Sequence, residues 1–189
     1  MNVEATIDAA PIGYDEVKRK ALIGAGEGLI CEFGVATGRY LRDMASMVPH
    51  RRFYGFDSWQ GLPEAWDQAA PAGAFKCDMP TDMPPNVELV VGLFQDSLIP
   101  FLGQHQEPFA FIHFDADLYS STKYVLQTIN PWVHDTLMMF DQIFDQVPGE
   151  HYRRDHEGRA FQDYLDETGI NCALVGRHKR DGAIFRVWK

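Results

Sequence analysis

Five short apolar runs, each ending in small or acidic residues, constrain the fold of this 189-residue chain more than any other feature. They occupy residues 29–34, 52–57, 87–92, 109–115 and 136–141. Apolar runs of about four to eight residues between turn signals are typical of buried strands. The segments between them have helical spacing, for example at Tyr40, Met44, Met47 and Val48, and again at Val125, Ile129 and Trp132. Strands that alternate with helices predict a parallel sheet covered on both faces.

The end of the chain departs from this alternation. Residues 157–168 have an amphipathic helical pattern, and Gly169 is expected to stop that helix. Residues 172–176 and 183–188 then flank a short polar link ending in Asp-Gly, which predicts an antiparallel hairpin. We therefore expect an α/β fold with a Rossmann-like, doubly wound, mostly parallel sheet closed by a C-terminal antiparallel β-hairpin. The length of the chain and its 46% apolar content predict a single domain over residues 1–189. We expect this domain to begin with a helical segment at 1–25.

Charge and cysteine content exclude several classes of function. A net charge of -10 argues against nucleic acid or an anionic membrane as a partner, because phosphates are bound by clustered Lys and Arg. Cys31, Cys77 and Cys172 are odd in number and lack C-x-x-C spacing, which argues against a disulfide framework or a zinc site. The chain has neither an N-terminal apolar leader nor an apolar run long enough to span a bilayer. We predict a soluble, cytoplasmic protein.

A long proline-rich stretch separates the second and third predicted strands. Residues 62–85 contain five prolines and few periodic apolar residues, and long loops in compact domains usually have a function. The loop follows the carboxyl end of a strand, where open sheets bind ligands. We expect residues 58–86 to form a lid or substrate loop. A contact between copies of a homo-oligomer is the alternative.

The first predicted strand runs into the motif E-x-G-x-A-x-G, formed by Glu32, Gly34, Ala36 and Gly38. Small residues there allow a tight turn and the close approach of a ligand, although a turn without any ligand is the alternative. Asp57 closes the second strand, where an acid can reach ribose hydroxyls. Acids also follow other strands, at Asp96 and Asp115. An acidic rim favours S-adenosylmethionine, which has a positive sulfonium, over NAD with its pyrophosphate.

Four longer motifs carry a specific resemblance: CEFGVATGRYLR, FYGFDSWQGLPEAW, NVELVVGLFQDSL and FIHFDADLYSST. In order and spacing they are similar to class I S-adenosylmethionine-dependent methyltransferases, and resemble the macrocin O-methyltransferase-like (TylF-type) family from about residue 29 to 142. The resemblance implies cofactor contacts at the strand ends. The residues concerned are Glu32, Gly34 and Gly38 of the loop, Asp57 and Ser58 for the ribose, and Gly92, Leu93 and Phe94 near the adenine. We expect Ala36 and Asp115 to bind the cofactor as well. Asp96 is expected to cap a helix that begins near Ser97, and a contact with the adenine amino group is the alternative.

A second group of polar residues follows the fourth and fifth strands. Asp115 and Asp117 end one strand, and Asp141 and Gln142 end the next, so their side chains can converge at one edge of a parallel sheet. Carboxylate and amide oxygens suit Mg²⁺. The resembling family holds magnesium here to bind paired substrate hydroxyls, but it commonly has a second acid where this chain has Gln142. We expect Asp117, Asp141 and Gln142 as ligands. Hydrogen bonds from these acids to loop backbones or to the cofactor's amine are the alternative.

Candidates for proton transfer are fewer. His156 is our predicted general base, because an imidazole can accept a proton near neutral pH. Asp117 is the second predicted catalytic residue. His151, in the same polar segment, is the alternative base. The other candidates have simpler structural interpretations. His113 is expected in the core, His105 and His134 on surface loops, Ser120 and Ser121 at a helix N-cap, Tyr119 near the substrate, and Lys123 on a solvated helix face.

Together these features predict an O-methyltransferase that transfers a methyl group from S-adenosylmethionine to a hydroxyl of a small molecule. The resemblance implies a sugar or a polyhydroxylated natural product as the acceptor, with possible assistance from Mg²⁺. Two alternatives stay open. One is a metal-dependent glycosyltransferase that uses the D-x-D of residues 115–117, and the other is a non-catalytic module that binds S-adenosylmethionine.

Overall fold

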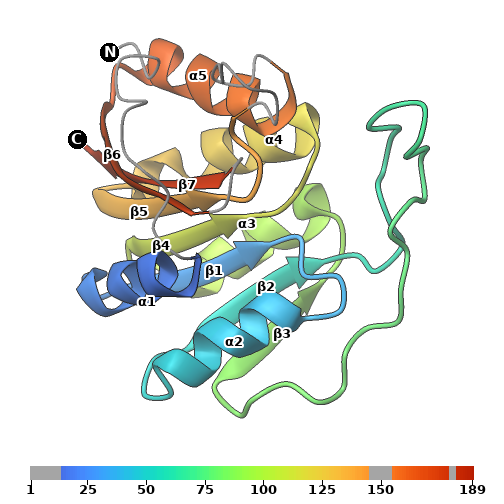
Figure 1. The fold of residues 1–189 in the computed structure, drawn as a ribbon, viewed down its shortest axis with the longest axis horizontal. Helices are drawn as coiled ribbons and strands as arrows, with labels where there is room; N and C mark the ends of the chain where they lie inside the picture. The colour runs from blue at the N-terminus through green and yellow to red at the C-terminus, as the bar shows by residue number, and fades with distance from the viewer. Residues whose placement is uncertain (1–13, 145–154, 179–181) are drawn as a thin grey trace.

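The computed structural model describes residues 14–144, 155–178 and 182–189, and its centre is a seven-stranded sheet (Figure 1). The strand order is β3-β2-β1-β4-β5-β7-β6. Strands β1 to β5 are parallel, and β7 is antiparallel to both of its neighbours, β5 and β6. The predicted fold class is thereby confirmed. The strands are β1 (Leu29–Phe33), β2 (Phe53–Asp57), β3 (Val87–Val91), β4 (Phe109–Phe114), β5 (Asp135–Phe140), β6 (Asn171–His178) and β7 (Gly182–Trp188).

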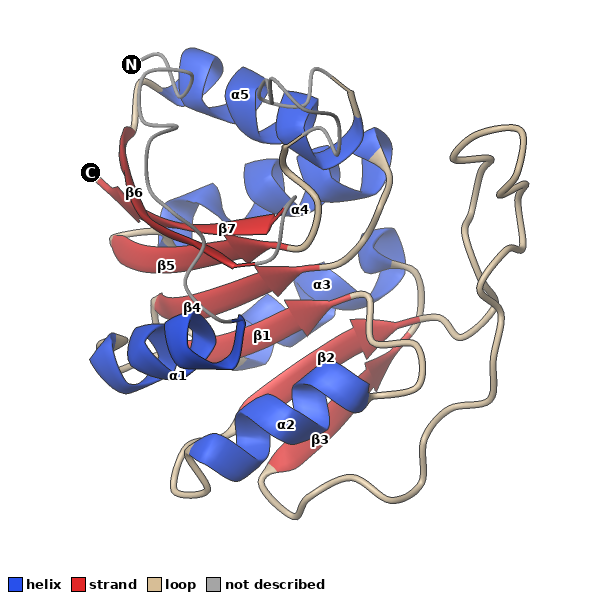
Figure 2. Ribbon diagram, viewed as in Figure 1, coloured by secondary structure: helices blue, strands red, loops and turns tan. Residues whose placement is uncertain are grey.

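Helices cover both faces of the sheet (Figure 2). On one face α1 (Tyr14–Gly24) and α2 (Arg39–Met47) pack against Ile30, Phe111 and Met139. On the other face, α3 (Phe94–Gln104), α4 (Tyr119–Ile129) and α5 (His156–Thr168) pack on a larger cluster that includes Phe33 and Phe140. A short 3₁₀ helix, η2 (Asn130–Trp132), follows α4. Because both faces are covered, β1 and β4 are buried at every position.

The ends of these elements agree with the sequence predictions in most places. Gly169 ends α5 in the left-handed conformation, with a φ of 65°. Of the predicted helical segment at 1–25, the described part is α1, and residues 1–13 lie outside the described residues. Within the described chain, no helix combines the length and hydropathy needed to cross a bilayer.

Two predicted helix caps were wrong. Ser120 and Ser121 lie inside the first turn of α4, because the chain turns sharply at Asp117, with a φ of 59°, and the extended residue Leu118 takes the N-cap position. Asp96 likewise lies in the first turn of α3. There the chain bends at Gly92, with a φ of 139°, so the helix begins three residues earlier than Ser97.

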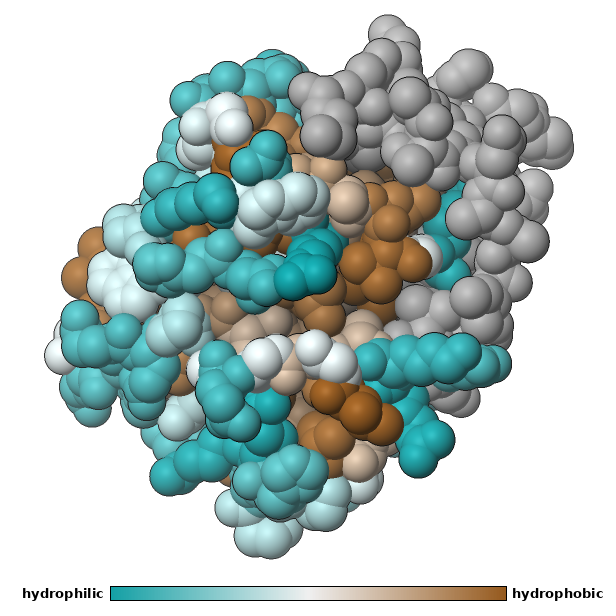
Figure 3. Space-filling view, turned by 90° about the vertical axis from the view of Figure 1, so that its left-hand side faces the viewer, coloured by the Kyte–Doolittle hydropathy of each residue, from teal (hydrophilic) through white to brown (hydrophobic). Residues whose placement is uncertain are grey.

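The long loop between β2 and β3 stands out beyond the carboxyl ends of the strands (Figure 1). The opposite side of the molecule, seen in Figure 3, shows mostly hydrophilic residues around hydrophobic groups near its middle. The candidate site lies between the carboxyl ends of the strands and this loop.

Candidate functional site

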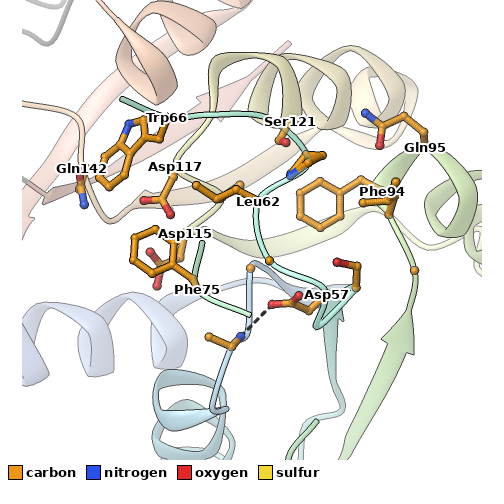
Figure 4. A pocket seen from close by; sticks show the side chains of 18 residues that line it. Asp57, Leu62, Trp66, Phe75, Phe94, Gln95, Asp115, Asp117, Ser121 and Gln142 are labelled. Carbon is orange, nitrogen blue, oxygen red and sulfur yellow. Dashed lines mark hydrogen bonds between the residues drawn. The ribbon is translucent and has the colours of Figure 1, made fainter. Parts of the chain in front are cut away.

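A pocket of about 340 Å³ opens at the carboxyl ends of β1, β2 and β4, beneath the loop of residues 58–86 (Figure 4). Many residues predicted from the sequence converge on it. The predicted residues that line it are Gly34, Ala36, Asp57, Ser58, Gly92, Leu93, Phe94, Asp115, Asp117 and Gln142. The other predicted residues lie outside the lining: Glu32, Gly38, Asp141 and His156.

Asp57 organises one half of the pocket. Its Oδ2 accepts hydrogen bonds from the backbone N–H groups of Val35 and Ala36, both at 2.8 Å, and its Oδ1 accepts one from Trp59 at 2.8 Å. The indole N–H of Trp59 returns to the carbonyl of Ala36 at 2.8 Å. The carboxylate thus ties the loop after β1 to the end of β2. A carboxylate has about four acceptor positions, so Asp57 keeps capacity for a hydroxyl in the pocket that it lines.

Close packing explains two of the small residues in the motif, against backbone at Gly34 and against side chains at Gly38. A Cβ on Gly34 would lie 2.0 Å from the carbonyl oxygen of Asp115, so β1 and β4 can end side by side only with glycine there. A Cβ on Gly38 would lie 2.8 Å from Sδ of Met83 and 3.1 Å from Pro80, both in the long loop. These glycines therefore join the strand ends to each other and to the loop, and both have positive φ.

Glu32 lies beneath the pocket and belongs to a buried polar group. Glu32 on β1 and His113 on β4 are direct cross-strand neighbours, and Nδ1 of His113 is 2.7 Å from Oε1 of Glu32. Both side chains are fully buried. Lys18 of α1 is buried as well, and its ammonium lies 5.4 Å from the centre of the Tyr40 ring. The prediction of a core position for His113 is confirmed.

Burial and the charges of this group shift the pKa values of Glu32 and His113. Burial raises the pKa of Glu32, while the hydrogen bond from His113 and the charge of Lys18 oppose the rise. The pKa of His113 is also raised, because burial is outweighed by the hydrogen bond with Glu32 and by nearby carboxylates. A charged imidazole beside a carboxylate is the state that this geometry favours.

Asp115, Asp141 and His113 form a compact group whose potential ligand atoms lie within 4.8 Å of one another. Burial, followed by the negative charge of Asp141, raises the pKa of Asp115 to about 7. Asp117 stands outside this group although it lines the pocket. Asp117 and Asp141 were predicted as ligands together, whereas the structure brings Asp115 close to Asp141.

Glu157 is a further acid near the pocket and was not predicted from the sequence. It lies in the first turn of α5, is fully buried, and accepts hydrogen bonds from the backbone N–H of Ala116 at 3.0 Å and of Gln142 at 3.4 Å. Burial and the charge of Asp115 raise its pKa well above the usual range. Glu157 therefore fastens α5 to the loops that carry the other acids. An acid in a first helical turn is a common feature, so the sequence carried no specific signal for this role.

Backbone strain is concentrated around the pocket. Among the described residues other than glycine, positive φ occurs at Ala36, Trp59, Phe75, Asp117 and His156. Three of them line the pocket, Trp59 bonds to Asp57, and His156 touches Trp66 of the lining. Strained backbone of this kind is typical of ligand sites, because it persists only where the surroundings fix it.

The loop of residues 58–86 supplies several further lining residues, which were not predicted individually from the sequence, and Gln95, Ala116 and Ser121 complete the lining. Its contributions beyond Ser58 are Gly61, Leu62, Pro63, Trp66 and Phe75. In Figure 4, the side chains of Trp66 and Phe75 lie on the same side of the pocket as those of Asp115, Asp117 and Gln142, whereas Asp57 and Phe94 lie across from them. The pocket thus has one half formed by the glycine loop and Asp57, and another formed by the acids and the aromatic residues of the loop.

The remaining predicted residues have mixed outcomes. His156 meets Trp66 with ring centres 5.8 Å apart, and His151 lies outside the described residues. Tyr119 donates its hydroxyl to Asp163 at 2.8 Å. The prediction of a solvated Lys123 was wrong: its side chain is 10% exposed and forms an ion pair with Glu167 at 2.7 Å, because α5 packs against α4.

The chain matches no family model and no curated protein sequence, but it matches solved structures. One is the apo structure of a TDP-rhamnose 3'-O-methyltransferase of calicheamicin biosynthesis, with 26% identity, coverage of 92% of this chain and 76% of the other, and a TM-score of 0.58. Another is an O-methyltransferase from Bacillus cereus in complex with S-adenosylhomocysteine, with 17% identity, 97% and 84% coverage, and a TM-score of 0.62. A third is the O-methyltransferase TomG of tomaymycin synthesis from Streptomyces achromogenes, solved in complex with S-adenosylmethionine. It has 14% identity, coverage of 92% of this chain and 77% of the other, and a TM-score of 0.53.

The fold and the pocket together define a class. The chain has the Rossmann-like fold of class I S-adenosylmethionine-dependent methyltransferases, with the terminal antiparallel strands included. The matched structures named above are O-methyltransferases, and one of them acts on a sugar.

Proposed function

We propose that this chain is an S-adenosylmethionine-dependent O-methyltransferase that acts on a hydroxyl of a small molecule, with a sugar or polyhydroxylated natural product as acceptor. The observation that carries the proposal is the position of Asp57. It closes β2, holds the loop after β1 through two backbone N–H groups, and still lines the pocket. An acid at this place can accept hydrogen bonds from ribose hydroxyls.

The lining fits the parts of the cofactor in turn. Gly34 and Ala36 leave the pocket wall without bulky side chains beside Asp57, and Leu93 and Phe94 offer an apolar surface for an adenine ring. The carboxylate of Asp115 lies toward the other half, where a positive ammonium or sulfonium would be favoured. S-adenosylmethionine, when bound, supplies an electrophilic methyl group that transfers to the acceptor oxygen in line with the sulfur.

The proton of the acceptor hydroxyl needs a base on the same side. Asp117 lines the pocket beside Trp66 and Gln142 and is held there by a strained backbone. We assign proton acceptance to Asp117, and keep His156, whose ring contacts that of Trp66, as the second candidate. Asp117→Asn and His156→Asn separate the two: the variant that removes the base should lower kcat by about 100-fold or more, with the affinity for S-adenosylhomocysteine unchanged.

The acids fit a divalent cation. Asp115 and Asp141 present carboxylates to each other, and the pKa of Asp115 is raised by burial and then by the negative charge of Asp141, a charge that a cation would offset. Gln142 lines the pocket and can add an amide oxygen. We therefore propose Asp141 and Gln142 as magnesium ligands, with Asp115 or Asp117 as the further acid. Bound Mg²⁺ would lower the pKa of an acceptor hydroxyl.

The alternatives account for fewer observations. A glycosyltransferase would use Asp115 and Asp117 but would leave unexplained the glycine loop and the contacts of Asp57. A non-catalytic module would account for the cofactor half but not for the acids and strained backbone of the other half. We also propose membership of the macrocin O-methyltransferase-like family and a cytoplasmic location, the latter because Cys31, Cys77 and Cys172 are free thiols.

Calorimetric titration with S-adenosylhomocysteine tests the proposal, repeated after EDTA and with added Mg²⁺. We expect saturable binding of one equivalent. Release of S-adenosylhomocysteine from S-adenosylmethionine in the presence of polyhydroxylated acceptors would then establish turnover. Absence of binding in every condition, together with binding of a UDP-sugar, would replace the methyltransferase by the glycosyltransferase.

A further inference from the structure

A hairpin within the long loop holds two aromatic side chains at the mouth of the pocket. The N–H of Leu62 donates to the carbonyl of Ala74 at 2.9 Å, and the N–H of Gly73 donates to the carbonyl of Leu62 at 2.8 Å. At the tip, Asp67 accepts hydrogen bonds from the N–H groups of Ala69 and Ala70, at 2.7 and 2.8 Å. The hairpin of residues 61–75 therefore carries its own hydrogen bonds and has a defined shape.

Contacts with the body fix this hairpin over the acids. Glu64 accepts a hydrogen bond from the hydroxyl of Ser120 in the first turn of α4. The ring of Trp66 meets His156 at the start of α5, with an interplanar angle of 80°. Because α4 begins two residues after Asp117, these contacts place Trp66 in the acidic half of the pocket, beside Asp117.

Phe75 is the most unusual residue of the hairpin. It lines the pocket, yet its side chain is 56% exposed, and its backbone has a φ of 63°, a conformation that bulky residues rarely adopt. Exposure and backbone strain are both unfavourable in the free protein. A ligand that covers the ring would offset both, which is why we interpret Phe75 as part of a binding surface.

Trp66 and Phe75 form a corner rather than a flat slot. Their ring centres are 6.3 Å apart and their planes meet at 61°. The polar groups of Asp117 and Gln142 lie beside this corner, on the same side of the pocket (Figure 4). A ligand in this space would present apolar C–H groups to the two rings and hydroxyls to the polar side chains next to them, and a corner suits a puckered ring better than a planar one. The carboxylates of the lining disfavour a phosphate close by.

We propose that Trp66 and Phe75 are specificity-determining residues that receive the apolar face of a pyranose ring, and that this ring is carried by an uncharged glycoside. The inference rests on the proposed methyltransferase function, since it concerns the acceptor of that reaction. The hydroxyl edge of the ring faces Asp117, which places the acceptor oxygen in the acidic half of the pocket.

Saturation-transfer difference NMR on the protein saturated with S-adenosylhomocysteine provides the test. The probes are methyl α-L-rhamnopyranoside and phenyl β-D-glucopyranoside as uncharged pyranosides, catechol as a planar diol, and TDP-rhamnose as a charged sugar. We expect saturation of ring C–H protons in at least one uncharged pyranoside. Preferential binding of catechol or of TDP-rhamnose would overturn the assigned ligand class, and so would the absence of any pyranoside signal.

Variants test the two residues themselves. Trp66→Ala and Phe75→Ala should each reduce the pyranoside signal at least fivefold, and Trp66→Phe should retain most of it. Met79→Ala is the matched control, because Met79 is an exposed apolar residue of the same loop that does not line the pocket. If Trp66→Ala fails to fold, Phe75→Ala decides the question, since its ring is largely exposed.

The affinity for S-adenosylhomocysteine separates this inference from the proposed function. It should stay within twofold of the wild-type value in every variant. A pyranoside signal that is unchanged in Phe75→Ala and Trp66→Ala would overturn the inference while leaving a methyltransferase. A loss of S-adenosylhomocysteine binding in these variants would also overturn it, because the aromatic pair would then serve the cofactor. Failure of the wild-type protein to bind S-adenosylhomocysteine would instead remove the proposed function.

Discussion

The two halves of the pocket are built in different ways. The half formed by the glycine loop and Asp57 consists of strand ends that touch through backbone atoms, and Gly34 leaves no space for even one added carbon against Asp115. In the other half, the acids at the strand ends are joined by Trp66 and Phe75, two side chains on a loop, one of them largely exposed. The first half is thus dictated by the sheet, whereas the aromatic part of the second half can change without disturbing the sheet. A fold of this kind identifies the methyl donor but leaves the acceptor to the loop.

The largest expected effect tests the claim that the strand ends tolerate no added atoms. In Gly34→Ala the new Cβ would meet the carbonyl oxygen of Asp115 at 2.0 Å, so we expect a loss of about 3 kcal/mol or more in the free energy of unfolding. Gly73→Ala is the control. Gly73 also has positive φ, but nothing lies within 4 Å of a Cβ there, so backbone strain alone predicts a loss of about 1 kcal/mol. Urea denaturation measures both, and equal losses would contradict the comparison.

Asp57 should matter more to ligand binding than any acid of the loop. Asp57→Ala removes the acceptor of three backbone N–H groups and an acid of the lining, and we expect the affinity for S-adenosylhomocysteine to fall about 100-fold, or roughly 2.7 kcal/mol. Asp67→Ala is matched to it, because Asp67 also accepts two backbone hydrogen bonds, but at the tip of the hairpin. Calorimetry should find its affinity unchanged. A similar loss in both variants would show that the two halves do not act separately.

The variant Glu32→Gln tests whether Glu32, the acid of the E-x-G-x-A-x-G motif, contacts the cofactor. Because Glu32 is buried below the pocket and bonded to His113, we expect a loss of about 2 kcal/mol in unfolding free energy but less than a threefold change in S-adenosylhomocysteine affinity. The exposed Glu88→Gln, which loses a surface contact with Arg52, should change stability by less than about 0.5 kcal/mol. A tenfold loss of affinity in Glu32→Gln would restore the direct contact predicted from the sequence.

The smallest expected effect concerns pH and metal. The folded protein holds the proton of Asp115 up to a pKa of about 7, above the usual 3.8, so it binds more protons than the unfolded chain between these values. The contribution of Asp115 to stability is therefore full below about pH 4 and is lost as the pH rises toward 7. Relative to Asp115→Asn, the wild-type protein should lose on the order of 1–2 kcal/mol across this window.

Added Mg²⁺ sharpens the same test. At pH 8 it should raise the melting temperature of the wild-type protein more than that of Asp115→Asn, and EDTA should remove the difference. An identical response of the two proteins would exclude Asp115 from the metal site.

Much of the sheet could be predicted because its signals are local. Apolar runs ending in small or acidic residues mark β1, β2 and β4, and an Asp-Gly link marks the hairpin of β6 and β7. Helix starts were harder to predict. The chain turns at Gly92 and Asp117 in backbone conformations that depend on neighbouring strands, so the caps predicted at Asp96 and at Ser120 were wrong.

The site was predictable where it lies at strand ends and unpredictable where it depends on packing between distant segments. Asp57 and Asp115 follow strands, so their place at one edge of the sheet follows from topology. The cross-strand pairing of Glu32 with His113 requires the register of β1 against β4, which the sequence does not display. Glu157 and Trp66 reach the site from α5 and from the loop, and no local pattern predicts where such segments fold back.

The position of β7 has a consequence for how the protein is made. β7 follows both β5 and β6 along the chain, yet it lies between them in the sheet. During synthesis, β5 must therefore present an open edge while more than one further element leaves the ribosome, and β6 cannot pair with it without occupying the place of β7. An open strand edge is a template for pairing with other chains. Because Asp141 follows β5 directly, the acids of the site should be among the last groups to be fixed on the growing protein.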